Sequence, residues 1–339
     1  MSTHCVLGQG LTTQANGRHK AHAMKNTLVT LIGGGGFLGR YVAQALLESG
    51  ARVRIAQRDP RQAFFLKPLG GLGQTQFAVA DISKPESIRR AVAGSDAVVN
   101  LVGILSGDFQ KIQVDGARIV AEAAAAAGVA SLVHVSAIGA DPHSASAYGR
   151  SKGEGEAAVR AAFPTATILR PSIVFGREDQ FINRFAAMVA TAASMPLVHV
   201  VPVLRAGTKF QPVYVGDVAD AVMAALTHPE LAAGKTLELG GPDILSMGAL
   251  VRWIAKATNR APKIVELPDS IGAAIAAAGF LPGAPITQDQ WKMLASDNVV
   301  SATNGLELLG ITPTPLDAVA PGWLVRYRKG GRFAVPAAA

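Results

Sequence analysis

Short apolar runs alternate with longer amphipathic segments along the first half of the chain. Continuous apolar runs predict strands at 27–33, 52–58, 75–82, 96–103, 131–139 and 166–176. Patterns with helical spacing lie between them, at 40–50, 84–94, 114–128 and 148–163. Strands that alternate with crossover helices form right-handed parallel units, and strands this apolar are covered on both faces of the sheet. The pattern therefore predicts an α/β fold with a doubly wound parallel sheet.

The pattern loosens after Gly176. We expect a strand and then a helix within 208–226, a further strand within 234–243, and an amphipathic helix at 245–259. Ser83 is expected to cap the helix at 84–94, and Asp217 to lie near the cap of the helix that ends at 226. These elements predict a smaller C-terminal α/β lobe.

One charge-free stretch, 185–204, has nearly the length of a membrane span. Pro196 and Pro202 interrupt it, and His199 lies within it. A helix followed by a buried extended segment is therefore the better interpretation.

Four consecutive glycines, Gly33 to Gly36, and then Gly39 join the first predicted strand to the first predicted helix. Such a turn lets the backbone approach a pyrophosphate, and the helix N-terminus offers it free N–H groups. Two spacings fit, Gly34-x-Gly36-x-x-Gly39 and Gly33-x-x-Gly36-x-x-Gly39, and the residues around the turn favour the second. The sheet is thus predicted to be of the Rossmann type, with a bound dinucleotide.

Residues at the end of the second predicted strand indicate whether the bound dinucleotide is NAD(H) or NADP(H). Asp59 lies about twenty residues beyond Gly39, which suits an acid that binds the ribose 2′-hydroxyl of NAD. Arg58 stands closer to the strand end, and its guanidinium could clamp a 2′-phosphate. We therefore favour NADP(H), with NAD(H) as the alternative. Asp81 and Ile82 close the third predicted strand and are expected to face the adenine.

Tyr148 and Lys152 lie four residues apart, on one face of a predicted helix, and Ser136 ends the strand before it. The lysine is expected to lower the pKa of the tyrosine and to hold the nicotinamide ribose. The tyrosine could then exchange a proton with a carbonyl or an alcohol while Ser136 orients the reacting oxygen. These three residues are the candidates for catalysis. The alternative is an ordinary surface helix.

Composition narrows the class of protein further. The chain has 339 residues, of which 49% are hydrophobic and 17% charged, so it is globular and not disordered. Its net charge of +8 comes from scattered Lys and Arg without a basic run, so we expect no nucleic-acid partner. The single cysteine, Cys5, excludes a disulfide within the chain, and neither a metal nor a nucleophile role is expected for it.

We expect four parts of the chain. They are a flexible leader at 1–26, a dinucleotide-binding Rossmann domain at 27–176 with its core completed by 208–240, a smaller lobe mainly at 177–332, and a tail at 333–339. The leader lacks the apolar core of a secretory signal. A second methionine, Met24, precedes the first predicted strand, which favours a start site assigned too far upstream.

The glycine turn, the Tyr148–Lys152 pair and Ser136 together resemble the atypical or extended short-chain dehydrogenase/reductase superfamily. The sequence "LRPSIVFG" at 169–176 is similar to its Arg-Pro-x-x-Val-Tyr-Gly element, with Phe175 in place of the tyrosine. The resemblance places Pro171 against the nicotinamide. The expected cofactor-binding residues are then Gly33, Gly36, Phe37, Leu38, Gly39, Arg58, Asp81, Ile82, Leu101, Val102, Tyr148, Lys152 and Pro171.

A narrower resemblance covers nearly the whole chain, from about 27 to 330. The sequences "FFLKPLGGLGQ" (64–74), "GRED" (176–179), "QPVYVGDVADAV" (211–222) and "LGITPTPLD" (309–317) are similar to the nucleotide-binding accessory subunit of respiratory complex I, NADH:ubiquinone oxidoreductase, and its bacterial relatives. That family is regarded as holding its nucleotide for structure and not for redox chemistry.

The resemblance implies a subunit that stabilises or assembles complex I near its quinone region, peripheral to the membrane. It would lie on the cytoplasmic face of a bacterial inner membrane, or on the matrix face in a mitochondrion. The basic surface and the apolar sequence at 270–283 suit docking against a membrane-embedded assembly. Two alternatives stay open: a free-standing NADP-dependent reductase, dehydrogenase or sugar-nucleotide epimerase that uses Tyr148 and Lys152, and a regulatory protein that senses the nucleotide.

Overall fold

The computed structural model describes residues 24–195, 199–281 and 286–333. Cys5, most of the predicted leader, Pro196 and the predicted tail after Phe333 lie outside the described residues.

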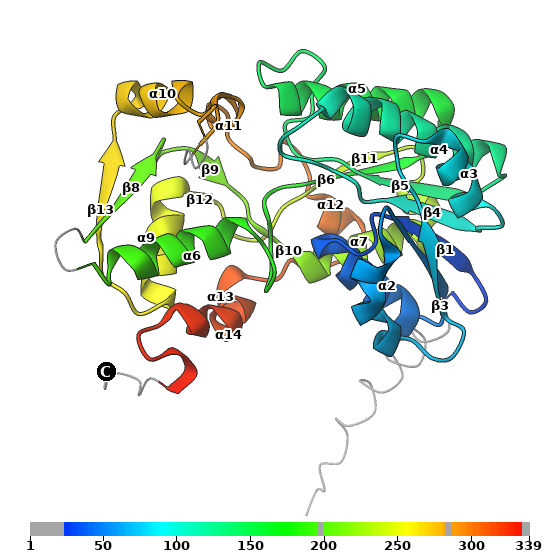
Figure 1. Ribbon diagram of the computed structural model, residues 1–339, viewed down its shortest axis with the longest axis horizontal. Helices are drawn as coiled ribbons and strands as arrows, with labels where there is room; N and C mark the ends of the chain where they lie inside the picture. The colour runs from blue at the N-terminus through cyan, green and yellow to red at the C-terminus, as the bar shows by residue number, and fades with distance from the viewer. Residues whose placement is uncertain (1–23, 196–198, 282–285, 334–339) are drawn as a thin grey trace, which may run out of the picture.

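Seven parallel strands form the central sheet (Figure 1). Their order across the sheet is β11-β6-β5-β4-β1-β2-β3. The strands are β1 (Leu28–Ile32), β2 (Arg52–Gln57), β3 (Thr75–Val79), β4 (Ala97–Asn100), β5 (Ser131–Val135), β6 (Thr167–Pro171) and β11 (Thr236–Leu239). The prediction of an α/β fold with a doubly wound parallel sheet is confirmed.

Helices cover both faces of this sheet (Figure 1). One face carries α2 (Phe37–Glu48) and α7 (Val215–Thr227), and the other carries α3 (Pro85–Val92), α4 (Gly116–Ala126) and α5 (Ala147–Ala162). Side chains alternate along a strand, so β1 serves both layers: Val29 and Leu31 pack toward α2, and Ile32 packs toward α4. Two irregular helices follow strands, the 3₁₀ helix η1 (Pro60–Leu69) and the π-helical η2 (Gln110–Asp115).

A smaller lobe, at the left of Figure 1, has its own core. Buried side chains such as Ile182, Val203, Leu250 and Ile254 form it. The helices are α6 (Phe181–Ala192), α9 (Met247–Ala257), α10 (Asp269–Ala277), α11 (Gln288–Met293), α13 (Leu316–Val319) and α14 (Pro321–Leu324). The strands pair as β8 (Val200–Leu204) with β13 (Lys263–Leu267), and β9 (Lys209–Phe210) with β12 (Leu245–Ser246).

The remaining elements are short. They are β7 (Val174–Phe175), β10 (Val213–Tyr214), α8 (Pro229–Ala232), α12 (Gly305–Leu308), η3 (Val325–Tyr327) and η4 (Gly331–Phe333). The stretch 185–204 contains the end of α6 and then β8, so a helix followed by an extended segment is confirmed where the stretch is described. The extended segment is only partly buried, because Val200 and Pro202 are exposed while Val201 and Val203 are buried. No helix among the described residues is long and apolar enough to cross a membrane.

Each of the six strands predicted in the first half of the chain is shorter in the structure. The apolar run 166–176 divides, because β6 ends at Pro171 and β7 pairs with β10 outside the central sheet. Between them, the hydroxyl of Ser172 donates to Asn298 Oδ1 (2.6 Å). The third strand ends at Val79, before the residues predicted to close it.

The predicted cap at Ser83 is wrong, whereas Asp217 lies near the start of its helix as predicted but does not cap it. Helix α3 begins after Lys84 without a side-chain cap, because the Ser83 hydroxyl donates instead to Asp81 Oδ1 (2.8 Å). Asp217 lies inside the first turn of α7, where it accepts the N–H of Thr314 (2.6 Å). In each case the short polar side chain satisfies a nearby loop and not the helix end.

Candidate nucleotide-binding site

Glycine is required at two positions of the turn between β1 and α2. Gly33 has a φ of 83°, in the left-handed region that side chains disfavour. A Cβ at Gly39 would stand 2.4 Å from the carbonyl oxygen of Gly34, so α2 packs onto the turn only with glycine there. The turn is closed by the N–H of Gly36, which donates to Gly33 O (3.1 Å). This geometry favours the Gly33-Gly36-Gly39 spacing.

The N-terminus of α2 has the properties of an anion-binding site. Gly36 is its N-cap, no side chain caps it, and its first turn contains no acid. The N–H groups of Phe37 and Leu38 have no acceptor among the described residues. Free amides and the positive end of the helix dipole favour a phosphate at this point.

A cavity of about 700 Å³ opens beside this turn, at the carboxyl ends of β1, β2, β3 and β4. Parallel sheets of this kind bind ligands at that edge, and the volume is typical of cofactor sites. Seven of the predicted cofactor residues line it: Gly33, Gly36, Arg58, Asp81, Ile82, Leu101 and Val102. Six others lie outside its lining: Phe37, Leu38, Gly39, Tyr148, Lys152 and Pro171.

Two arginines line the cavity with different surroundings. Arg58 is exposed and has no hydrogen bond or ion pair with the described residues. The pKa of Asp81 is lowered mainly by its hydrogen bonds from Ser83, with a smaller contribution from the charge of Arg58. Arg40 pairs with Glu178 (3.1 Å) and lies over the ring of Phe65, yet its Nε is buried without a partner. An unpaired guanidinium and an orphaned N–H are both suited to an anionic ligand.

Asp59 also lines the cavity, but its carboxylate is occupied. It accepts the backbone N–H of Arg61 (3.2 Å) and the guanidinium Nε of the same residue (2.9 Å), and it thereby caps η1. These bonds to Arg61 lower the pKa of Asp59. The acid expected to bind a ribose 2′-hydroxyl is therefore bound to its own helix.

Sequence reasoning did not single out Gln57, although it ends β2 and lines the cavity. Its Oε1 accepts the N–H of Gly35 (3.0 Å), and its Nε2 donates to Asp59 O (2.7 Å). Gln57 thus joins the glycine turn to the loop that carries Arg58. A polar residue at the end of a strand next to the glycine turn was the available signal. Asp108 and Lys111 also line the cavity, and no motif in the sequence indicates either residue.

Lys152 lies behind the cavity wall. Its side chain is buried, and Nζ donates to the carbonyl oxygen of Val135 (3.3 Å) at the end of β5. Nζ would also stand 3.2 Å from a Cβ at Gly103, a residue that lines the cavity. Burial lowers the pKa of Lys152 to about 8, while the charge of Glu156 acts in the opposite direction. The ammonium of Lys152 is therefore separated from the cavity by Gly103, which has no side chain.

Tyr148 corrects one expectation. Burial raises its pKa to about 12, whereas Lys152 was expected to lower it. Desolvation dominates because the half-buried phenol packs edge-on against Phe109 (6.1 Å between ring centres), and no hydrogen bond joins it to Lys152 in the described structure. At neutral pH the phenol is protonated and serves as a donor.

Ser136 follows β5 directly, and its hydroxyl is buried without a hydrogen-bond partner among the described residues. A buried polar atom left in this way costs free energy, which a bound ligand can repay. Pro171 is buried at the end of β6, where its carbonyl oxygen accepts the N–H of Ile138 (3.1 Å). Ser136 directly follows β5 and Pro171 ends the neighbouring strand β6, so both lie at the carboxyl edge of the sheet, where Lys152 of α5 contacts the end of β5.

The chain belongs to the NAD dependent epimerase/dehydratase family, whose model matches residues 29–240. It has the NAD(P)-binding epimerase/reductase fold, in agreement with the superfamily expected from its motifs.

Comparison with curated proteins narrows the relationship. The chain is 36% identical over 325 residues to NADH dehydrogenase (ubiquinone) 1 alpha subcomplex subunit 9, mitochondrial, of Mus musculus, which covers 92% of this chain and 84% of the mouse protein. It is 31% identical over 297 residues to a ceramide reductase of Caulobacter vibrioides, covering 86% of this chain and 87% of that one. The predicted resemblance to the complex I accessory subunit is confirmed.

Solved structures agree on the fold. The NADPH-dependent quinone oxidoreductase QOR2 of Escherichia coli, complexed with NADPH, superposes with a TM-score of 0.70 at 20% identity. The match covers 87% of this chain and 99% of that one, so it includes the smaller lobe as well as the sheet.

Proposed function

We propose that this protein is a nucleotide-binding accessory subunit of respiratory complex I that holds NADP(H) as part of its structure. The observation that carries the proposal is the 36% identity to the mouse subunit, which extends over 92% of this chain. The family model matches only residues 29–240, whereas the similarity to the mouse subunit covers 92% of the chain. The similarity to the subunit therefore includes the smaller lobe as well.

The residues around the cavity fit the nucleotide. The free amides at the start of α2 would bind the pyrophosphate, and the 103–104 backbone with Lys152 would receive the nicotinamide ribose. Arg58 and the orphaned Nε of Arg40 would bind a 2′-phosphate, which favours NADP(H) over NAD(H). Asp81 and Ile82 would lie near the adenine.

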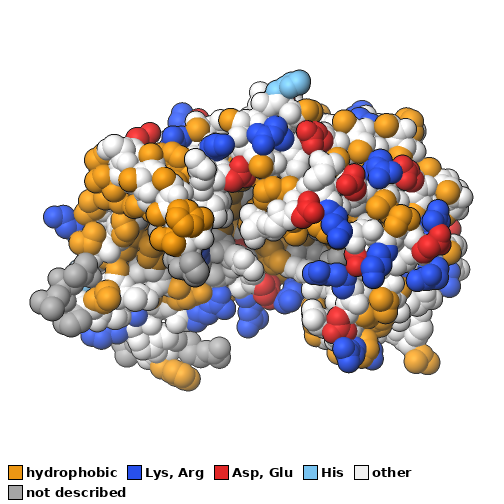
Figure 2. Space-filling model, turned by 45° about the horizontal axis from the view of Figure 1, so that its top comes forward, with side chains coloured by type: hydrophobic (Ala, Val, Ile, Leu, Met, Phe, Trp, Pro, Cys, Tyr) orange, Lys and Arg blue, Asp and Glu red, His pale blue; other side chains and the backbone are white. Residues whose placement is uncertain are grey.

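Its place in the cell follows from the same proposal. We place it against other complex I subunits near the quinone region, peripheral on the cytoplasmic face of a bacterial inner membrane or the matrix face in a mitochondrion. Figure 2 shows hydrophobic side chains gathered over the smaller lobe, on the left of the molecule. In the smaller lobe, Ile271 of α10 and the nearby Phe280 and Leu281 are exposed, which supports docking against an apolar partner.

Purification from membranes tests the proposal. The protein, tagged at its chromosomal locus, is isolated in mild detergent, and mass spectrometry identifies both the partners and the released nucleotide. We expect complex I subunits and NADP(H), and deletion of the gene should reduce the amount of intact complex on native gels. Recovery as a free protein that turns over an added carbonyl compound would contradict it.

A free-standing reductase is the second candidate, because the Ser136 hydroxyl is unpartnered and the similarity extends to a ceramide reductase. NADPH, when bound, would supply a hydride to a carbonyl carbon, and the protonated Tyr148 would donate to its oxygen. This candidate predicts that Tyr148→Phe abolishes NADPH oxidation with a ketone or oxidised ceramide and leaves folding intact. Unchanged complex I assembly in the same variant would separate the two functions.

A further inference from the structure

The carboxylate of Asp289 joins the smaller lobe to the N-terminus of α5. It accepts the N–H of Ala147 (2.6 Å), the N–H of Tyr148 (3.1 Å) and the hydroxyl of Ser146 (3.1 Å). Asp289 belongs to the first turn of α11, so a residue distant in sequence satisfies donors that α5 cannot satisfy itself. Ser146 completes the cap by accepting the N–H of Gly149 (3.1 Å).

This cap positions the helix that carries the nicotinamide end of the site. The amide of Tyr148 is bonded to Asp289 directly, and Lys152 follows one turn later on the same helix. Because an α-helix is rigid over this length, a displacement of α11 moves both side chains.

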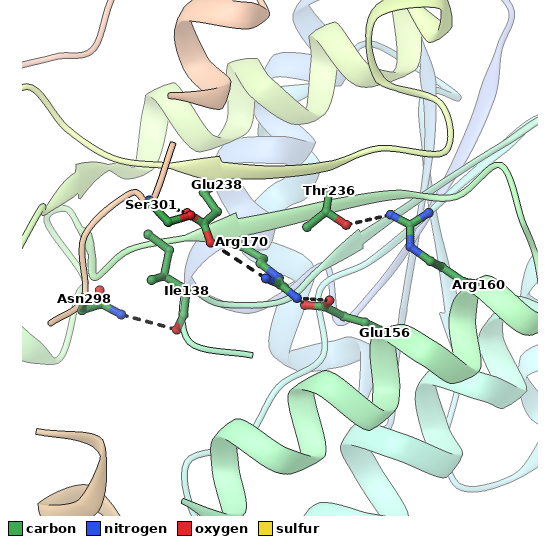
Figure 3. A network of polar contacts seen from close by, with 8 residues as sticks. All are labelled: Ile138, Glu156, Arg160, Arg170, Thr236, Glu238, Asn298 and Ser301. Atoms are coloured by element: carbon green, nitrogen blue, oxygen red, sulfur yellow. Dashed lines mark hydrogen bonds and ion pairs between the residues drawn. The ribbon is translucent and has the colours of Figure 1, made fainter. Parts of the chain in front are cut away.

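Asn298 provides a second link, visible in Figure 3. Its Nδ2 donates to the carbonyl oxygen of Ile138 (3.5 Å), in the loop that begins at Ser136. Its Oδ1 accepts the N–H of Ile173 (3.1 Å) and so holds the chain just beyond β6.

A third link runs through charged side chains (Figure 3). The N–H of Ser301 donates to Glu238 Oε2 (2.7 Å), and Glu238 lies 3.8 Å from the guanidinium of Arg170. Arg170 in turn donates two hydrogen bonds to Glu156, at 2.9 and 2.6 Å, on the turn of α5 that follows Lys152.

The residues that make these three links lie in or after α11, within 287–301, and α11 also supports the apolar surface of the smaller lobe. Helix α11 packs on α10 so closely that a Cβ at Gly272 would stand 2.5 Å from the ring of Trp291, and Arg205 stacks on that ring (4.1 Å). Hydrophobic side chains of α10, α11 and the turn after α10 face solvent: Ile271, Phe280, Leu281 and Met293.

We infer that residues 287–301 couple the nucleotide site to the exposed apolar surface of α10 and α11, with Asp289 and Asn298 as the positioning residues. Nucleotide held against α5 stabilises the position of α11, and a complex I subunit docked on α10 and α11 tightens the binding of nucleotide. The two effects are equal in free energy because linkage is reciprocal. The inference rests on the proposed function, which supplies both the NADP(H) in the site and the complex I subunit on the apolar surface.

Hydrogen exchange of the full chain, with and without NADPH, tests the coupling. In the wild-type protein, we expect NADPH to slow exchange in α10 and α11 as well as in the glycine turn. Asp289→Asn replaces one acceptor by a donor and removes the charge at the α5 N-terminus, so protection of α11 by NADPH should disappear and NADPH affinity should fall about five- to tenfold.

Asp269→Asn is the matched control. It makes the same chemical change in the first turn of α10, where Asp269 is exposed, has no bond to α5 and contributes only a long ion pair to Arg205 (3.7 Å). This variant should retain both the affinity and the protection.

Asn298→Asp is a second variant, which keeps the proposal testable if the Asp289 variant misfolds. It keeps the acceptor for the N–H of Ile173 and replaces the donor to Ile138 by an oxygen, so the affinity for NADPH should fall about two- to threefold. NADPH binding to the wild type without protection of α10 and α11 would overturn the coupling and leave the proposed nucleotide site intact. Absence of NADPH binding in the wild type would instead contradict the proposed function.

Discussion

The carboxylate of Asp59 is bound by Arg61, with Nε 2.9 Å from Oδ1 and Nη2 3.2 Å from Oδ2. This bidentate pair satisfies the acid that a ribose 2′-hydroxyl would need, at the same cavity where Arg58 makes no hydrogen bond or ion pair with the described residues. The cavity beside β2 thus presents an exposed cation next to an acid that is already paired.

Replacing Arg58 by Ala should weaken NADP(H) at least about tenfold and NAD(H) less than about threefold, because only the 2′-phosphate loses a charged partner. Calorimetric titration of both nucleotides measures the ratio. Arg61→Ala is the control, since it frees Asp59 and should improve NAD(H) relative to NADP(H). Equal losses for both nucleotides in the Arg58 variant would refute the assignment.

Gly39→Ala should destabilise the protein by about 2 kcal/mol or more, because its Cβ would collide with the carbonyl of Gly34. Binding of either nucleotide should be lost as α2 moves off the turn. Gly207→Ala meets no atom within 4 Å and should change neither property. Urea unfolding and nucleotide titration of the two variants check this, and a fully stable Gly39 variant that binds NADPH would contradict it.

Lys152→Met should stabilise the nucleotide-free protein at pH 7 by about 2–3 kcal/mol, because burial lowers the pKa of this lysine from 10.5 to about 8. The charged form is disfavoured in the folded state, and this cost is fully present below pH 8. It disappears as the pH rises toward 10.5, so the advantage of the variant should vanish there.

The same variant should bind NADP(H) more weakly, since the ribose loses its ammonium donor. Unfolding free energies at pH 7 and pH 10, with NADPH titrations at pH 7, separate the two effects. A variant less stable than wild type at pH 7 would show that Lys152 contributes net stability.

Glu156→Gln should lower the free energy of unfolding by about 2 kcal/mol, because it removes the buried carboxylate that forms an ion pair with Arg170. It should also lower the pKa of Lys152 further, since Glu156 opposes the effect of burial there. Glu238→Gln, whose contact with Arg170 is longer at 3.8 Å, should cost less than about 1 kcal/mol. Equal losses in denaturant unfolding would contradict this ranking.

Local sequence patterns predicted the sheet and the glycine turn because both depend on short-range chemistry. Continuous apolar runs identify strands buried on two faces, and a strand-to-helix turn that contains Gly33 needs no distant residue to form. The seven cavity-lining residues among the candidates all lie within or directly after such strands or turns.

The parts that escaped prediction depend on residues far apart in sequence. Asp289 accepts from Tyr148 across 141 residues, and Asp217 accepts from Thr314 across 97, so no local spacing indicates either bond. The pKa of Tyr148 was predicted in the wrong direction for the same reason. It depends on burial by packing and not on the neighbouring lysine.

Strand β11 enters the central sheet only after the chain has passed through α6, β8 and α7. We therefore expect that the first 176 residues do not fold as an independent unit, although they contain the glycine turn and all the candidate catalytic residues. Such a fragment would leave β6 as an open edge, with the backbone groups that pair Leu169 to Leu237 available to other chains, and it should aggregate. On a ribosome, the sheet is completed only once the segment through Leu239 has emerged, and α9, β13, α10 and α11 of the smaller lobe emerge later still.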